Sequence, residues 1–101
     1  MRMLMNIRIP HETFNAAVKD GTAGAKLSRL VEDSKPEAAY FTDHDGQRGA
    51  VFIIELSDAS KIPGLAEPWF LTFQADVELR IVMSPADLQR AGLAEIGKKW
   101  C

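Results

Sequence analysis

The stretch Val77–Met83 constrains the fold more than any other part of the sequence. Side chains on a β-strand point alternately to the two faces of a sheet. One face of this strand would carry only apolar residues, namely Val77, Leu79, Ile81 and Met83. The other face would carry Glu78, Arg80 and Val82. The apolar face must be buried under helices, whereas the mixed face needs a different kind of cover.

The length and composition of the chain limit its class. A chain of 101 residues can form one domain, residues 1–101, around a single core. Its net charge of −2, without a cluster of Lys and Arg, disfavours nucleic acid as a partner. The chain has one cysteine, Cys101, so it cannot form an internal disulfide. No apolar run is long enough to span a membrane. The segment Met1–Ile9 lacks the features of a signal peptide. We therefore expect a cytoplasmic protein with no membrane partner.

In the first third of the chain, the spacing of apolar residues is first that of a strand and then that of a helix. Met3–Ile9 alternates like a strand. A helix is predicted from a cap at Thr13 to about Val31, with a break or kink at Asp20–Gly21–Thr22. Gly21 and Gly24 fall on the inward face of this helix, where they would let it lie close to a sheet.

A hairpin is predicted next. Lys35–Pro36 ends the helix, and Ala38–Thr42 is a short strand. Asp45–Gly46 lies between two apolar runs and favours a tight turn. The following strand runs from about Gly49 to Leu56, with Phe52, Ile54 and Leu56 on one face and Val51, Ile53 and Glu55 on the other.

Two further helices flank the strand Val77–Met83. Asp58 or Ser60 can cap the first, and Pro68 should bend or end it before Trp69. Ser84–Asp87 combines a cap, a proline and an acid in the pattern of a helix start. In the C-terminal helix that follows, a fourfold spacing relates Leu88, Gly92, Ile96 and Trp100.

The predicted order is β-α-β-β-α-β with an extra C-terminal helix. This is the ferredoxin-like arrangement of the α+β class. It implies a four-stranded antiparallel sheet in the spatial order fourth, first, third, second.

The face of this sheet away from the helices is unusual in composition. It is too apolar for a solvent face and too charged for a dry core. We therefore predict a homodimer in which two such faces stack, with the charged residues pairing or surrounding a small polar cavity. The alternative is the solvated face of a monomer. The residues concerned are Leu4, Asn6, Arg8, Ala38, Tyr40, Thr42, Val51, Ile53, Glu55, Glu78, Arg80 and Val82.

Several motifs resemble those of dimeric α/β-barrel proteins. They are Lys35–Phe41 before the hairpin, Ala66–Leu71 at the end of the second helix, and Asp76–Pro85. Within that superfamily the chain is similar, over nearly its whole length, to small bacterial proteins known only as a domain of unknown function. The resemblance implies the fold and a homodimer. The superfamily includes muconolactone isomerase-like enzymes, monooxygenases without a cofactor, haem-binding proteins and regulators. Because these functions differ, the resemblance assigns no catalytic residue to this chain.

Five side chains of the mixed face are candidates for lining a ligand cavity, namely Arg8, Tyr40, Glu55, Glu78 and Arg80. In a pocket, an arginine can hold a carboxylate while Glu55 or Tyr40 exchanges a proton. The alternative is an ion-pair network at the seam of a dimer.

Other candidates stand alone in the sequence. His11 can act as a general base at the mouth of the barrel, or lie idle on the surface. Trp69 can line an aromatic pocket or belong to the core. Asp43–His44–Asp45 lacks a further histidine or cysteine at ligand spacing, so we expect no metal.

The sequence thus supports two hypotheses about function. The first is a homodimeric binding or accessory module that takes a small molecule, with no assignable reaction and no cofactor. The second is a cofactor-independent, isomerase- or monooxygenase-like enzyme acting on a small polar or aromatic carboxylate in a cavity between the sheet and the second copy.

Overall fold

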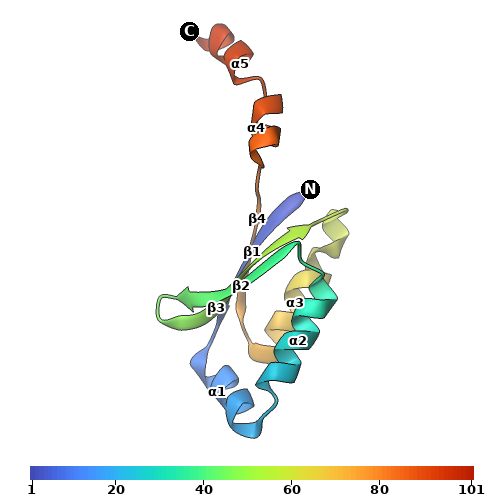
Figure 1. The fold of residues 1–101 in the computed structure, drawn as a ribbon, viewed down its shortest axis with the longest axis vertical. Coiled ribbons are helices and arrows are strands. Elements are labelled where there is room, and N and C mark those ends of the chain that lie inside the picture. The colour runs from blue at the N-terminus through green and yellow to red at the C-terminus, as the bar shows by residue number, and fades with distance from the viewer.

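The computed structural model describes all 101 residues and contains a four-stranded antiparallel sheet covered by helices on one face (Figure 1). The strands are β1 Arg2–Ile9, β2 Ala38–His44, β3 Gln47–Glu55 and β4 Asp76–Ile81, in the order β2-β3-β1-β4. The helices are α1 His11–Asp20, α2 Ala23–Ser34, the short 3₁₀ turn η1 Ala59–Lys61, α3 Ile62–Phe73, α4 Pro85–Arg90 and α5 Leu93–Trp100. The predicted ferredoxin-like α+β fold and its strand order are confirmed.

The core lies between the sheet and helices α1 to α3. Every second side chain of β1 is buried, namely Met3, Met5, Ile7 and Ile9. Phe52 of β3 meets Trp69 of α3 edge to face, with ring centroids 5.7 Å apart. Phe73, one turn further along α3, packs on Phe14 of α1 at 5.1 Å. Burying each of these large side chains stabilises the fold by roughly 1.5–3 kcal/mol, so the aromatic cluster ties α1 and α3 to the sheet.

The first helical segment departs from the sequence prediction at two points. Helix α1 begins at His11, directly after Pro10, so Thr13 lies inside its first turn and does not cap it. The Thr13 hydroxyl lies within hydrogen-bond distance of the Pro10 and Phe73 carbonyl oxygens. The break at Gly21 is confirmed, with φ of 82°. The role given to Gly21 and Gly24 is wrong, because both are exposed and have open space where a Cβ would be.

Pro68 is predicted to bend or end helix α3, but the helix continues through it to Phe73. A proline inside a helix removes one backbone hydrogen bond. Here two of the three aromatic residues that follow, Trp69 and Phe73, are almost fully buried, and their packing holds the segment helical. Before the helix, Asp58 caps η1 by accepting from the Ser60 amide at 2.8 Å, which lowers the pKa of the Asp58 carboxyl.

The hairpin between β2 and β3 turns at Asp45–Gly46 as predicted, with φ of 51° and 81°. Three strands come unusually close just beyond it. A Cβ at Gly49 would lie 2.8 Å from the Ile7 carbonyl oxygen and 3.3 Å from the His44 Cβ. Gly49 is therefore required by the close approach of the Ile7 carbonyl oxygen and the His44 side chain.

The chain leaves the sheet after β4 as a C-terminal arm, residues 82–101, that extends away from the rest of the molecule (Figure 1). The predicted helix start is confirmed: the Ser84 hydroxyl accepts from the Asp87 amide at 3.1 Å, and the Asp87 carboxylate accepts from the Ser84 amide at 2.9 Å. These hydrogen bonds hold the pKa of Asp87 below its usual value. The prediction of a single C-terminal helix is wrong, because Gly92, with φ of 73°, separates α4 from α5.

The end of β4 is also less covered than predicted. Val77 and Leu79 pack against the core, but Ile81 and Met83 are 63% and 66% exposed. The alternation of the strand is as expected, and the error lies in the extent of the helix layer, which stops short of this end of the sheet (Figure 1). None of the helices combines the length and apolar composition needed to cross a membrane.

We predict that Gly49→Ala lowers the free energy of unfolding by about 1–3 kcal/mol, because the added methyl group meets rigid backbone. Gly24→Ala, in helix α2, is the matched control. Its methyl group enters open space, and alanine favours a helix by about 0.5–1 kcal/mol over glycine. Urea denaturation measures both, and equal midpoints for the two variants would contradict the account of Gly49.

Candidate functional site

The face of the sheet opposite the helices is the candidate site, and we call it the open face. It contains the side chains that alternate with the core residues on each strand. They are Leu4, Asn6, Arg8, Ala38, Tyr40, Thr42, Val51, Ile53, Glu55, Glu78 and Arg80.

Strand pairing arranges these residues in rows across the sheet. One row runs Tyr40, Val51, Asn6, Glu78, and the next runs Ala38, Ile53, Leu4, Arg80. Residues directly opposite each other have Cβ atoms about 4.5–5.5 Å apart. The middle of the open face is therefore an apolar group of Leu4, Val51 and Ile53, half-buried by their neighbours, with charged residues on the β4 side.

The charged residues on β4 pair along the strand. Arg80 Nη2 lies 3.8 Å from Glu78 Oε2, and both side chains are two-thirds exposed. Tyr40, on the opposite edge strand, is 66% exposed. Its hydroxyl group is free to donate to a molecule resting on the open face, since no hydrogen bond of the protomer engages it.

A second polar group lies at the hairpin end of the open face. The guanidinium of Arg8 lies 3.7 Å from an Asp45 carboxylate oxygen and 3.5 Å from one of Asp76, and His44 Nε2 lies 3.8 Å from Asp45. One positive charge thus faces two carboxylates, so Arg8 is not a free anion site. An open depression surrounds this group, lined by Arg8, Pro10, Asp45, Gln47, Gln74 and Asp76.

His44 was considered in the sequence only as part of a metal motif. The structure shows a different arrangement, in which no three His, Cys, Asp or Glu side chains gather as metal ligands. His44 pairs with Gln47 in the strand register and belongs to the polar group around Arg8. The signal that could have placed it is the Asp45–Gly46 turn, because a two-residue hairpin loop fixes the pairing of the residues on either side.

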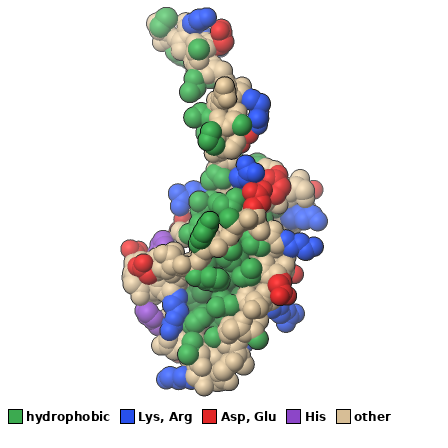
Figure 2. Space-filling view, in the orientation of Figure 1, with side chains coloured by type: hydrophobic (Ala, Val, Ile, Leu, Met, Phe, Trp, Pro, Cys, Tyr) green, Lys and Arg blue, Asp and Glu red, His purple; other side chains and the backbone are tan.

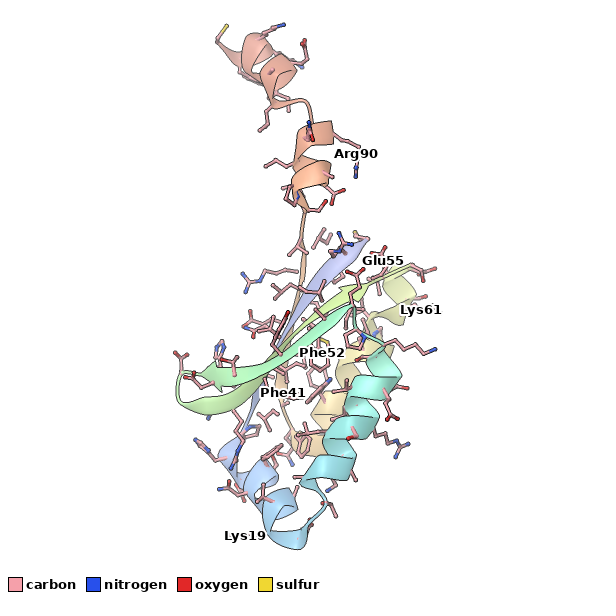
Figure 3. All side chains as sticks on the ribbon, viewed as in Figure 1. Lys19, Phe41, Phe52, Glu55, Lys61 and Arg90 are labelled. Atoms are coloured by element: carbon pink, nitrogen blue, oxygen red, sulfur yellow. The ribbon has the colours of Figure 1, made fainter.

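The five predicted cavity residues share the open face but do not converge within one protomer. Arg8 pairs with Gly49, six positions along β3 from Glu55, which is a separation of about 20 Å. Glu55 lies at the end of the sheet nearest the arm (Figure 3), where its carboxylate accepts from the N-terminal ammonium group of Met1. A carboxylate held by Arg8 therefore could not meet Glu55 of the same chain.

Two other candidates lie away from the open face. Trp69 is only 1% exposed and sits in the core on the opposite side of the sheet. His11 is exposed at the first position of α1, beyond the end of β1, and makes no hydrogen bond or ion pair. The structure brings neither of them to the rows that contain Tyr40 and Arg80.

Comparison with solved structures identifies the fold. The chain resembles 5-chloro-2-hydroxyhydroquinone dehydrochlorinase (TftG) from Burkholderia phenoliruptrix AC1100, solved in complex with 2,5-dihydroxybenzoquinone. The two are 18% identical, the match covers 86% of this chain and 99% of the other, and the TM-score is 0.54. A de novo designed protein, Ferredog-Diesel, is 14% identical over 80% of this chain and 85% of its own, with a TM-score of 0.45. No protein-family model and no curated protein matches the sequence.

The strand order and the likeness to the dehydrochlorinase define the fold class of the protein. It is an α+β protein of ferredoxin-like topology, as is the dehydrochlorinase. At this level of identity the likeness extends to the fold alone.

We expect Arg8→Met to change the free energy of unfolding by less than about 1 kcal/mol, because Arg8 and its two carboxylates are exposed and such pairs contribute little. Urea denaturation at low and high salt measures the effect. A loss of several kcal/mol at both salt concentrations would contradict this account and identify the group as a structural ion-pair network.

Proposed function

We propose that this protein is a homodimeric binding protein that holds a small polar or aromatic molecule between two stacked open faces. The observation that carries the proposal is the composition of that face. Leu4, Val51 and Ile53 form an apolar centre, while Tyr40 and Arg80 offer exposed polar groups on either side of it.

The apolar centre supports a second copy as the cover. Contiguous apolar surface of this kind usually marks an interface. Twofold symmetry makes an interface self-complementary, so the apolar rows of one copy would lie against those of the other. The charged residues at the margins, Glu78 and Arg80, are already paired and would remain near solvent at the rim. Such a rim adds specificity more than affinity.

The polar groups indicate the chemistry of the bound molecule. Arg80 can donate to a carboxylate or a phenolate oxygen, and the Tyr40 hydroxyl can donate to a carbonyl. A flat ring would fit in a gap between the two stacked faces, over the aliphatic rows and between Tyr40 and the Arg80 side chain at the rim. The dehydrochlorinase that shares this fold was solved with 2,5-dihydroxybenzoquinone, a flat molecule of this kind, which supports the same class of ligand here.

A second candidate function is a cofactor-independent enzyme, isomerase- or monooxygenase-like, acting on a small polar or aromatic carboxylate. The fold shared with an enzyme, the dehydrochlorinase, favours it. Within the open face Tyr40 and Glu78 lie in one row, and two copies would bring further proton-carrying groups to the same space. The two functions differ in one measurable respect, which is whether a bound molecule is consumed.

We predict that Ile53→Glu converts the dimer to a monomer, because it places a charge in the middle of the apolar centre. Leu71→Glu is the matched control. Leu71 is 80% exposed on α3, away from the open face, and the substitution adds the same charge. Sedimentation velocity gives the mass of each variant, and circular dichroism confirms that both are folded. A folded Ile53→Glu variant that remains as dimeric as Leu71→Glu would refute an interface through the open face.

A second prediction concerns ligand binding. Isothermal titration with benzoate and with 2,5-dihydroxybenzoquinone should detect binding to the wild-type dimer. Arg80→Met should weaken it by about tenfold or more, because a hydrogen bond to a charged group contributes roughly 1.5–3 kcal/mol. Tyr40→Phe should weaken it less, and both variants should stay dimeric. If both ligands bind Arg80→Met as they bind wild type, the ligand does not rest on the open face; consumption of either molecule would favour the enzyme.

A further inference from the structure

We infer that the C-terminal arm is exchanged between the two copies of the dimer, each arm packing its apolar side chains against the other copy. This inference rests on the proposed homodimer and adds a second, separate interface to it. Five observations carry it.

The helices of the arm are too short to exist without tertiary contacts. Helix α4 has 6 residues and α5 has 8. Isolated helices shorter than about 12–15 residues are marginal in water. The capping box at Ser84 and Asp87 nevertheless specifies where α4 starts. The sequence thus specifies where a helix starts, but the helix is too short to be stable in isolation. We therefore expect the arm to fold against the surface of another part of the protein or of a second copy.

The arm carries an apolar stripe that has no cover within the protomer. Leu93, Ile96 and Trp100 are spaced by three and four residues and so lie on one side of α5, where they are 60%, 47% and 78% exposed. Nearer the sheet, Leu88 on α4 is 44% exposed, and Ile81 and Met83 at the uncovered end of β4 are 63% and 66% exposed. Figure 2 shows hydrophobic side chains gathered along the arm as well as on the body.

Four of the five charged side chains of the arm are paired within it, and the fifth, Lys99, lies over the ring of Trp100. Arg90 pairs with Asp87, and Lys98 Nζ lies 3.2 Å from Glu95 Oε1. Both pairs lie within the arm, three residues apart, as is typical of a solvated helix side. What the arm lacks is apolar contact, and this argues against an acidic or basic partner.

The size of the uncovered surface matches a second copy of the chain. The protomer exposes 6950 Å², whereas a compact monomer of 11.2 kDa exposes about 5,700 Å². Its radius of gyration of 17.2 Å likewise exceeds the value of about 13 Å for a compact domain of this length. The excess of roughly 1,250 Å² is more than the roughly 800 Å² that each partner buries in a standard protein interface. A small ligand could not cover it.

The path of the chain directs the arm away from its own body. The Val82 amide donates to the Arg2 carbonyl at 3.0 Å, which continues the β4 pairing beyond Ile81. Ser84 is extended as well, with φ of −77° and ψ of 165°. Only Met83 lies between these two fixed points. The arm is therefore carried past the end of the sheet, where in a stacked dimer the other copy is the available surface, and symmetry makes the exchange reciprocal.

The test compares two substitutions in the full-length chain that add the same charge to opposite sides of α5. Ile96→Glu lies within the stripe, and Ala94→Glu lies on the exposed far side. Sedimentation of each variant over a dilution series gives the dimer dissociation constant. We expect Ile96→Glu to raise it by about 30-fold or more, as for a central interface residue, and Ala94→Glu to leave it within about threefold. Equal dissociation constants for the two variants would overturn the exchange.

Trp100 gives a second readout that does not depend on a destabilising substitution. Acrylamide quenches the fluorescence of exposed tryptophans, and Trp69 is buried. The difference in quenched fluorescence between the wild type and Trp100→Phe therefore reports on Trp100 alone. Trp100 should be protected in the dimer and become exposed on dilution. Protection that persists in the monomer would mean that the arm folds on its own body, and an exposed Trp100 in an intact dimer would mean that the arm is free. Either result overturns the exchange while leaving the stacked dimer standing, whereas a wild type that is monomeric throughout removes both.

Discussion

The packing of helices on a single face of the sheet is the constraint from which the rest of the structure follows. Phe52 against Trp69, and Phe73 against Phe14, fix α1 and α3 to that face and complete a core without buried polar groups. The chain has no further helix for the second face, because its last two helices continue outward from β4. The open face and the C-terminal arm are both consequences of the same shortage of covering elements.

Charge has a smaller role than the sequence suggests. The ion pairs of the open face and of the arm are exposed and local, as for Arg80 with Glu78 and for Arg90 with Asp87. Pairs of this kind contribute little to stability. The proposed assembly and ligand binding would therefore depend on apolar area, with polar groups such as Tyr40 setting the orientation of the ligand. This division is common in small-molecule sites, which are mostly apolar with a few placed polar groups.

Local sequence patterns predicted the strands, the Asp45–Gly46 turn and the cap at Ser84, because each depends on neighbouring residues alone. The strand order followed from the β-α-β-β-α-β sequence of elements. The errors arose where distant parts of the chain decide. Pro68 stays helical because aromatic packing outweighs its lost hydrogen bond, and Ile81 is exposed because the helix layer ends short of it. The open face could be listed in advance from alternation. The grouping of His44 with Arg8 and Asp45 depends on the hairpin register, which pairs His44 with Gln47.

Small-angle X-ray scattering of the wild-type protein, with the mass taken from the forward intensity, tests the central claim most directly. If a second copy covers the open face and the arm, the scattering mass at micromolar concentration is twice 11.2 kDa, and the particle is more compact for its mass than the isolated protomer. A particle of 11.2 kDa with a radius of gyration near 17.2 Å would contradict the claim, because the apolar surface would then be stable in water without any cover.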